Sequence, residues 1–444
     1  MIGEFHMESF FKIKARGSSV GKEIVGGLTT FLAMAYIVAV NPSILADAGI
    51  PFQAALTATC IGAAIMCLLM GLISNRPVAL ASGMGLNAVV AYTICLGEVA
   101  FDWRIAMAII LIEGVVILIL VLCGLRKAVM DAIPVDLRRA IGIGIGLFIS
   151  FIGLKGGGII AVSDSTLITV GNLTDPACIV AVICIAIAIL LWVLKVRGAL
   201  LISIVVGVII GIPMGVTTLP TEWNFGLDFS TFGAPFQSTP DGGMAILEAL
   251  TTPSLLLLAF SLLMCDFFDT MGTVVAVAQQ GEFIDEEGNV EDIQKILAID
   301  SVAAIAGGLF GCSSITSYVE STSGVADGAR TGLSNIVVAI MFVICAFLAP
   351  LFGMVSGSAT CGALVVVGFL MMSDIGMIDW KSPEIAIPAF LTIIMIPFTY
   401  SITTGIGFGF ISYVLVMLFR GKVKEIKPLM WVAALAFLAY FIFV

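Results

Sequence analysis

Apolar runs recur along almost the whole chain. They fall near 24–45, 53–73, 78–97, 104–124, 137–155, 176–196, 198–216, 253–279, 295–311, 313–329, 332–353, 358–374, 384–399, 401–420 and 428–444. About 20 apolar residues are enough to cross the ~30 Å hydrocarbon core of a bilayer. The pattern predicts an all-α polytopic membrane protein with fourteen crossings, and it leaves open whether the final run also spans.

Composition supports a membrane protein and argues against several other classes. Hydrophobic residues make up 60% of the chain and charged residues 11%, whereas a soluble domain carries about 25% charged residues. The ten cysteines form no CxxC pair, and the only histidine, His6, lies in residues 1–6, which we interpret as a cloning scar. We expect no disulfide scaffold, no metal site, no cofactor and no nucleic-acid partner.

The lysines and arginines predict the orientation, because positively charged loops stay in the cytoplasm. If residues 1–22 form a cytoplasmic tail and each run crosses once, 18 of the 20 basic residues fall inside and only Arg104 and Lys155 fall outside. The segment 217–250 has no lysine or arginine and lies outside. This asymmetry predicts a multi-pass protein of the cell (inner) membrane with a cytoplasmic N-terminus.

Two of the runs are interrupted. Residues 76–92 and 312–328 each combine a short extended stretch with the beginning of a helix. Non-helical backbone at membrane depth survives only where protein or a wet cavity satisfies it, and two such breaks at corresponding places point to a transporter's central site. The two interrupted runs are the third and the tenth. Their offset of seven is an odd number, which gives the two halves opposite topology, so the spacing predicts an inverted repeat of seven plus seven spans.

Carboxylates inside the runs are the candidate chemistry. They are Glu113, Asp266, Asp269, Asp300, Glu320 and Asp327. Each costs ~2.5 kcal/mol or more near the bilayer centre, so such residues are functional candidates by default. Asp266 and Asp269 share a helix face, and Glu320 begins the half-helix of the second broken run. We expect Asp269 and Glu320 to face one cavity between runs 3, 8 and 10.

Structural roles are the alternative for several of these residues. We expect Glu113 to meet a hydroxyl or amide neighbour, Asp300 to lie in the cytoplasmic half of its run, and Asp327 to make an end-of-helix contact near Arg330. The acidic stretch 282–292 is typical of a solvated connector.

A protease and a channel are two other functional classes that intramembrane acids could indicate. An intramembrane aspartyl protease needs two acids about 3 Å apart across a cleft, whereas Asp266 and Asp269 lie on one helix without a second matching motif. A channel would favour rings of carbonyls or like charges over one asymmetric pair of acids. The residues therefore favour a carrier, and we expect the protein not to be an enzyme.

Four segments resemble the nucleobase–cation symporter-2 superfamily, and more narrowly its AzgA-like branch of adenine, guanine and hypoxanthine permeases. They are GGLTTFLAMAYIVAVNPSIL (26–45), NRPVALASGMGLNA (75–88), CDFFDTMGT (265–273) and TSYVESTSGVADGARTGLS (316–334). The resemblance covers nearly the whole chain in order.

The resemblance implies a division into two domains. A core domain would comprise 23–124 and 251–353, and a gate domain would comprise 125–217 and 354–444, with 218–250 as an external loop. The gate domain would also mediate homodimerisation.

The resemblance also implies a substrate site. Asp269 and Glu320 would engage the base, helped by backbone at the breaks, around Gly83, Met84 and Gly85 in one and Val319 in the other. The resemblance assigns roles to Asp266 and Asn41 less directly, and Tyr36 and Thr273 are candidate supporting residues. The alternative role of Asn41 is to cap the end of run 1, and the alternative role of Tyr36 is packing. Related uracil and xanthine carriers have a glutamate where this chain has Asp269, so the shorter acid is consistent with a bicyclic purine.

The resulting hypothesis is a secondary active transporter that imports purine nucleobases by proton symport, with elevator-type alternating access. Glu320, Asp269 and Asp266 would carry the proton, since no sodium cage is evident. The alternative is a carrier of the same fold for another small solute, namely uracil, xanthine or an anion.

Overall fold

The computed structural model describes residues 10–97, 100–124, 133–220, 223–284 and 290–443. These residues are mostly helical, and nine of their helices are long and apolar enough to cross a membrane. The predicted all-α polytopic class is therefore confirmed. The count of fourteen crossings stays a prediction, because several of the remaining apolar helices are short.

The helices follow the predicted apolar runs. Before the loop at 218–250 they are α2 (Val20–Met34), α3 (Ile37–Asp47), α4 (Phe52–Leu69), α5 (Met84–Ala88), α6 (Trp103–Leu122), α8 (Val135–Gly156), α9 (Pro176–Val193) and α10 (Ala199–Gly211). From that loop onward they are α11 (Ala245–Thr251), α12 (Pro253–Gly281), α13 (Ile293–Phe310), α14 (Ser321–Ala326), α15 (Leu333–Ala346), α16 (Ala349–Phe352), α17 (Gly357–Met371), α18 (Pro383–Phe398), α19 (Ile402–Phe419) and α20 (Pro428–Phe443). An unpredicted break at Ala35 and Tyr36 divides the first run into α2 and α3.

Both interrupted runs have the predicted strand followed by a short helix. Strand β1 (Leu80–Ser82) precedes α5, and strand β4 (Ile315–Ser317) precedes α14. The two strands pair antiparallel, with Leu80 opposite Ser317 and Ser82 opposite Ile315. An exposed hairpin of β2 (Ile160–Ser163) and β3 (Leu167–Val170) forms the second small sheet.

Side chains satisfy the backbone groups that the strands leave unpaired. The Asn335 amide donates to the carbonyls of Arg76 and Val78, at 3.0 and 2.8 Å. The Ser321 hydroxyl accepts from the Ala79 amide at 2.9 Å, and the Cys67 thiol contacts both polar groups of Leu80. Unpaired buried backbone groups are costly, so these polar residues allow non-helical chain to persist at this depth.

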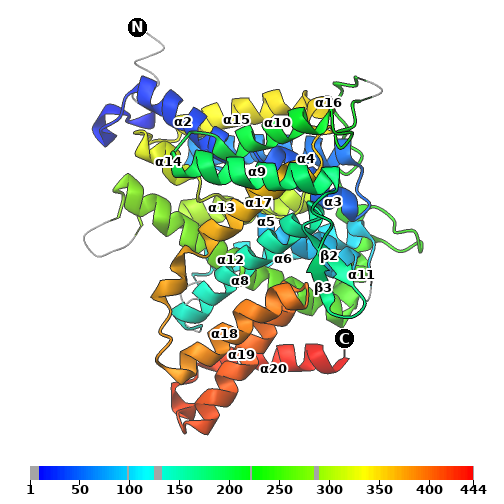
Figure 1. Cartoon of the computed structure of the whole chain (residues 1–444). Coiled ribbons are helices and arrows are strands. Elements are labelled where there is room, and N and C mark those ends of the chain that lie inside the picture. Colours follow the sequence, from blue (N-terminus) through cyan, green and yellow to red (C-terminus); the bar gives the residue numbers. More distant parts are fainter. Residues whose placement is uncertain (1–9, 98–99, 125–132, 221–222, 285–289, 444) are drawn as a thin grey trace.

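The helices divide into two packed groups by their contacts. In Figure 1, α18, α19 and α20 lie together at the lower end of the view. Helices α2, α3, α4, α6, α12, α13, α14 and α15 pack on one another around β1 and β4. Helices α8, α9, α10, α17, α18 and α19 form the other group, and α20 packs against α19 and α12. The first group carries both interrupted runs.

Charged side chains near helix ends connect distant segments. Asp327, directly after α14, makes the expected end-of-helix contact: its carboxylate accepts from the Thr29 hydroxyl at 2.6 Å and from the Arg197 guanidinium at 2.8 Å. In the acidic connector, Arg76 pairs with Glu291 and with Asp292 at 3.0 Å. The described end of this connector is thus tied to the start of the first interrupted run.

Glycines bring α6 and α13 close together. A Cβ on Gly114 would lie 2.7 Å from the backbone nitrogen of Ile305, and one on Gly308 would lie 2.8 Å from the carbonyl oxygen of Met107. Backbone atoms cannot move aside as a flexible side chain can. The α6–α13 contact therefore depends on the missing side chains.

We expect Gly114→Ala to lower the thermal unfolding temperature of the detergent-solubilised protein, because overpacking typically costs about 1–3 kcal/mol. Gly142→Ala is the matched control, since Gly142 also lies inside a helix and a Cβ there meets nothing within 4 Å. Equal unfolding temperatures for the two variants would contradict the close α6–α13 packing.

Candidate functional site

Glu320 stands at the junction between the second strand and its half-helix. It is the residue before α14, and its carboxylate accepts a hydrogen bond from the Tyr36 hydroxyl at 2.7 Å. Tyr36 lies at the break between α2 and α3 and is 1% exposed, whereas Glu320 is partly exposed. Tyr36, in the first apolar run, thus orients the acid of the second half.

Asp269 lies on α12 and is exposed, although the residues around it on the helix are mostly buried. It is close enough to Glu320 for the two charges to interact. The structure therefore brings together the two acids that the sequence singled out. A charged side chain in mid-span rarely faces lipid, so we interpret the exposure of Asp269 as a water-accessible position, called the hollow below.

The exposed face of α12 indicates where that hollow opens. From Asp269 toward the end of the helix at Gly281, Gly272 and Gln279 on the same face are also exposed. In the other direction, Cys265 and Leu262 on that face are buried. The exposed residues of this face thus lie on the C-terminal side of Asp269, which favours an opening toward that end of α12.

A cluster of rings packs between the two helix groups. Tyr400, between α18 and α19, lies 5.3 Å from the ring of Tyr92 and 4.9 Å from that of Phe148 on α8. The Tyr92 hydroxyl also donates to Asp47 at 2.8 Å, and the Lys155 ammonium lies 4.8 Å from the Tyr400 ring centroid. This cluster joins the group that carries the acids to the group that contains α8.

The predicted backbone positions lie at the two breaks. Gly83 donates its N–H to the Ser314 carbonyl at 2.9 Å, and Met84 lies beside it, 7% exposed. A Cβ on Gly85 would lie 2.9 Å from the Ile145 side chain of α8, so this break packs tightly against the other helix group. Val319 is 48% exposed next to Glu320.

Two supporting candidates are buried away from solvent. Thr273, one turn after Asp269, is 6% exposed. Asn41 is fully buried inside α3, where its amide donates to the Thr59 hydroxyl at 2.8 Å and to the Cys312 carbonyl at 3.2 Å. Asn41 therefore links α3 to α4 and to the chain entering β4, and it does not cap a helix.

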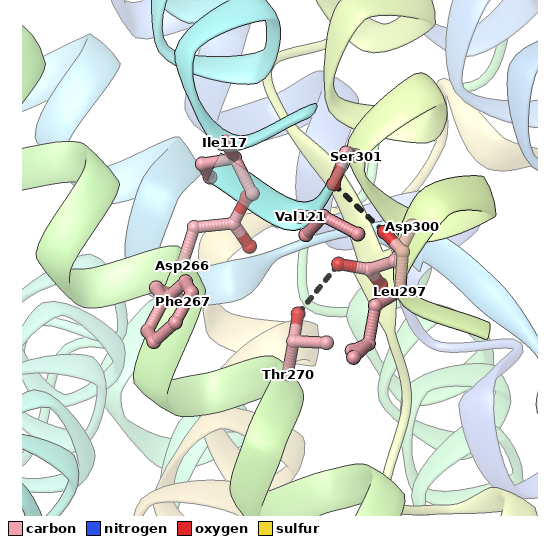
Figure 2. A pocket seen from close by; sticks show the side chains of 8 residues that line it. All are labelled: Ile117, Val121, Asp266, Phe267, Thr270, Leu297, Asp300 and Ser301. Carbon is pink, nitrogen blue, oxygen red and sulfur yellow. Dashed lines mark hydrogen bonds between the residues drawn. The ribbon is translucent and has the colours of Figure 1, made fainter. Parts of the chain in front are cut away.

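Asp300 on α13 holds the site's elements together, a role that the sequence did not reveal. One oxygen accepts from the Ser317 amide and hydroxyl at 2.8 and 2.7 Å, and the other accepts from the Thr270 hydroxyl at 2.7 Å. Figure 2 shows the Thr270–Asp300 bond beside Asp266, at a small cavity between α6, α12 and α13. The hydroxyl-rich stretch around β4 was the available signal for this network.

Asp266 faces away from solvent, unlike Asp269. It is 1% exposed, and one of its oxygens accepts from the Ser314 hydroxyl at 3.2 Å. Both carboxyl oxygens of Glu113 lack a hydrogen-bond donor in the described part of the chain, and the carboxyl of Asp266 is near enough to interact with Glu113. The expectation of a hydroxyl or amide partner for Glu113 was therefore wrong.

Residues 21–443 match the family model for xanthine/uracil permeases, which is described as "Permease family". The chain is also 40% identical over 448 residues to the guanine/hypoxanthine permease PbuG of Bacillus subtilis, covering 98% of this chain and 100% of that protein. It is 36% identical over 442 residues to the adenine permease AdeP of Escherichia coli, covering 100% and 97%.

The fold resembles a solved transporter domain. The transmembrane domain of the cyanobacterial bicarbonate transporter BicA superposes with a TM-score of 0.65 at 16% identity, covering 86% of this chain and 97% of that one. At this identity, the likeness concerns the fold alone.

We expect Asp300→Asn to destabilise the folded protein by about 1.5–3 kcal/mol, because hydrogen bonds to a charged acceptor contribute roughly that much. Asp164→Asn, at an exposed position of the β2–β3 hairpin, is the control and should be neutral. Thermal unfolding in detergent measures both. An Asp300→Asn protein as stable as the control would mean that Asp300 does not anchor β4.

Proposed function

Because the chain belongs to the permease family of xanthine and uracil carriers, the nucleobase–cation symporter-2 superfamily, we propose that it imports purine nucleobases together with protons. Members of this family are carriers, so the protein is not a protease. The names of two relatives, a guanine/hypoxanthine permease and an adenine permease, support a purine substrate. The observation that carries the proposal is that Asp269 is exposed in mid-helix and lies within charge-interaction range of the partly exposed Glu320.

The chemistry of a purine suits this pair of acids. A purine edge presents N–H donors beside ring-nitrogen acceptors, and a carboxylate accepts two parallel N–H bonds. Asp269 is exposed and accepts no hydrogen bond within the described part of the chain, so it is available to the base. Glu320 is already oriented by Tyr36 at 2.7 Å, and backbone at Gly83, Met84, Gly85 and Val319 completes the site.

Proton coupling follows from the same acids. Loss of hydration disfavours an ionised carboxylate, so an acid enclosed with a neutral purine favours the protonated form. Glu320, Asp269 and Asp266 are the groups that we propose to take a proton outside and release it inside. The membrane potential contributes ~2.3 kcal/mol per charge per 100 mV to this movement.

Alternating access would use the two helix groups as core and gate domains. Residues 23–124 and 251–353 form the proposed core domain, and 125–217 and 354–444 form the gate domain, in agreement with their separate packing. With the N-terminus in the cytoplasm, the C-terminal end of α12 faces inside, so this arrangement is inward-facing and the Tyr400 ring cluster closes the outer side. Elevator movement of the core, and a homodimer through the gate domain in the lipid bilayer, complete the proposal.

We expect Glu320→Gln and Asp269→Asn each to abolish accumulation of radiolabelled hypoxanthine while leaving the protein folded. Each change removes an acid from the hollow but keeps its size. The exposed Asp164→Asn variant is the control for expression and uptake. Wild-type accumulation by both site variants would refute the proposed site.

Competition by unlabelled solutes tests the substrate class. We expect adenine, guanine or hypoxanthine to block labelled hypoxanthine uptake, and an uncoupler to prevent accumulation more strongly at acidic external pH, where the inward proton gradient is larger. Inhibition by uracil or sulfate in place of the purines would favour the alternative of a carrier for another small solute.

A further inference from the structure

A second pair of acids lies at the contact between α6 and α12, one turn before Asp269 on α12. Asp266 on α12 and Glu113 on α6 are each 1% exposed, and their carboxyl groups lie within hydrogen-bonding range of each other. Both oxygens of Glu113 and one oxygen of Asp266 have no other hydrogen-bond donor in the described part of the chain. The remaining Asp266 oxygen accepts from Ser314.

Two ionised carboxylates cannot hydrogen bond, because each is only an acceptor. Their contact becomes favourable when one of them holds a proton, which then lies between the two groups. A buried acceptor without a partner costs about 1–3 kcal/mol, and more if charged. The orphaned oxygens of Glu113 therefore point to a bound proton.

The surrounding charges also favour a neutralised pair. The titratable groups that face it are Asp300 on α13 and Asp269 and Cys265 on α12. Asp300 accepts three hydrogen bonds, which suit its ionised form. Neither member of the pair is in an ion pair with a basic residue described here, and the described residues include no group of three or more side chains arranged to hold a metal.

We propose that Glu113 and Asp266 form a proton-binding site that is separate from the acids contacting the purine. This inference rests on the proposed proton symport and adds Glu113 to it. The pair lies where α6 packs on α12, and Thr270 on α12 is tied through Asp300 to β4. Loss of the proton would place two adjacent charges at this contact and would push α6 and α12 apart. Proton occupancy of the pair is thus coupled to the position of the helix that carries Asp269.

The decisive variant is Glu113→Gln, which keeps a hydrogen-bond donor toward Asp266 but cannot release a proton. Purified protein in liposomes is assayed in two ways: exchange of labelled for unlabelled hypoxanthine, and proton entry during net purine uptake, reported by a trapped pH dye. We expect Glu113→Gln to retain exchange but to lose proton entry and the pH dependence of net uptake. Glu425→Gln, an exposed glutamate near α20, should retain all three.

An unchanged proton-to-purine ratio and pH profile in Glu113→Gln would overturn the inference. The wild type in the same liposomes separates this outcome from failure of the proposed function: wild-type protein that carries no purine, or carries it without protons, refutes the symport itself.

Infrared spectroscopy tests the shared proton without altering the pair, and it decides the case if Glu113→Gln does not fold. In a protein carrying both Asp269→Asn and Glu320→Gln, the acids of the hollow are neutral amides. We expect a protonated-carboxyl band to persist at neutral pH in this protein and to exchange slowly in heavy water, because the pair is buried. Absence of the band would overturn the proposal.

Discussion

The constraint on which this structure depends is the need to satisfy backbone polar groups at the depth where two spans stop being helical. Strands β1 and β4 satisfy part of this need by pairing with each other. Asn335, Ser321 and Asp300 satisfy much of the rest through side-chain bonds from three different helices. Because those bonds come from elements distant in sequence, the breaks can exist only inside an assembled core.

This arrangement sets the positions of the acids. The end of β4 places Glu320 beside Tyr36 at the break of the first span, and Asp300 ties α12 to β4 through Thr270 and Ser317. Ionised groups near the bilayer centre are costly, and here each is compensated in a different way. Asp300 is surrounded by donors, Glu320 has one donor, and Asp269 faces the hollow.

Helix α12 separates two environments within one turn. Asp269 is exposed toward the hollow, whereas Asp266, three residues earlier, is buried against α6 and contacts Glu113. In the proposed mechanism a purine and a proton are bound one turn apart on one helix, and movement of that helix affects both. Because Asp266 and Asp269 lie only three residues apart on α12, helix packing is enough to couple the two sites, and no chain of intervening residues is required.

The sequence by itself determined the membrane class and the two interrupted spans, and its four motifs identified the family. It also singled out Asp269 and Glu320 as candidate site residues. Hydropathy, helix interruptions and charged residues within apolar runs are local features, so they can be recognised in the sequence without knowledge of the fold. Only the tertiary structure decided that Asp300 anchors β4, that Glu113 meets Asp266 and that Asp327 pairs with Arg197. Each of these partners comes from a distant part of the chain, and an acid's role depends on whether a donor, another acid or water faces it after folding.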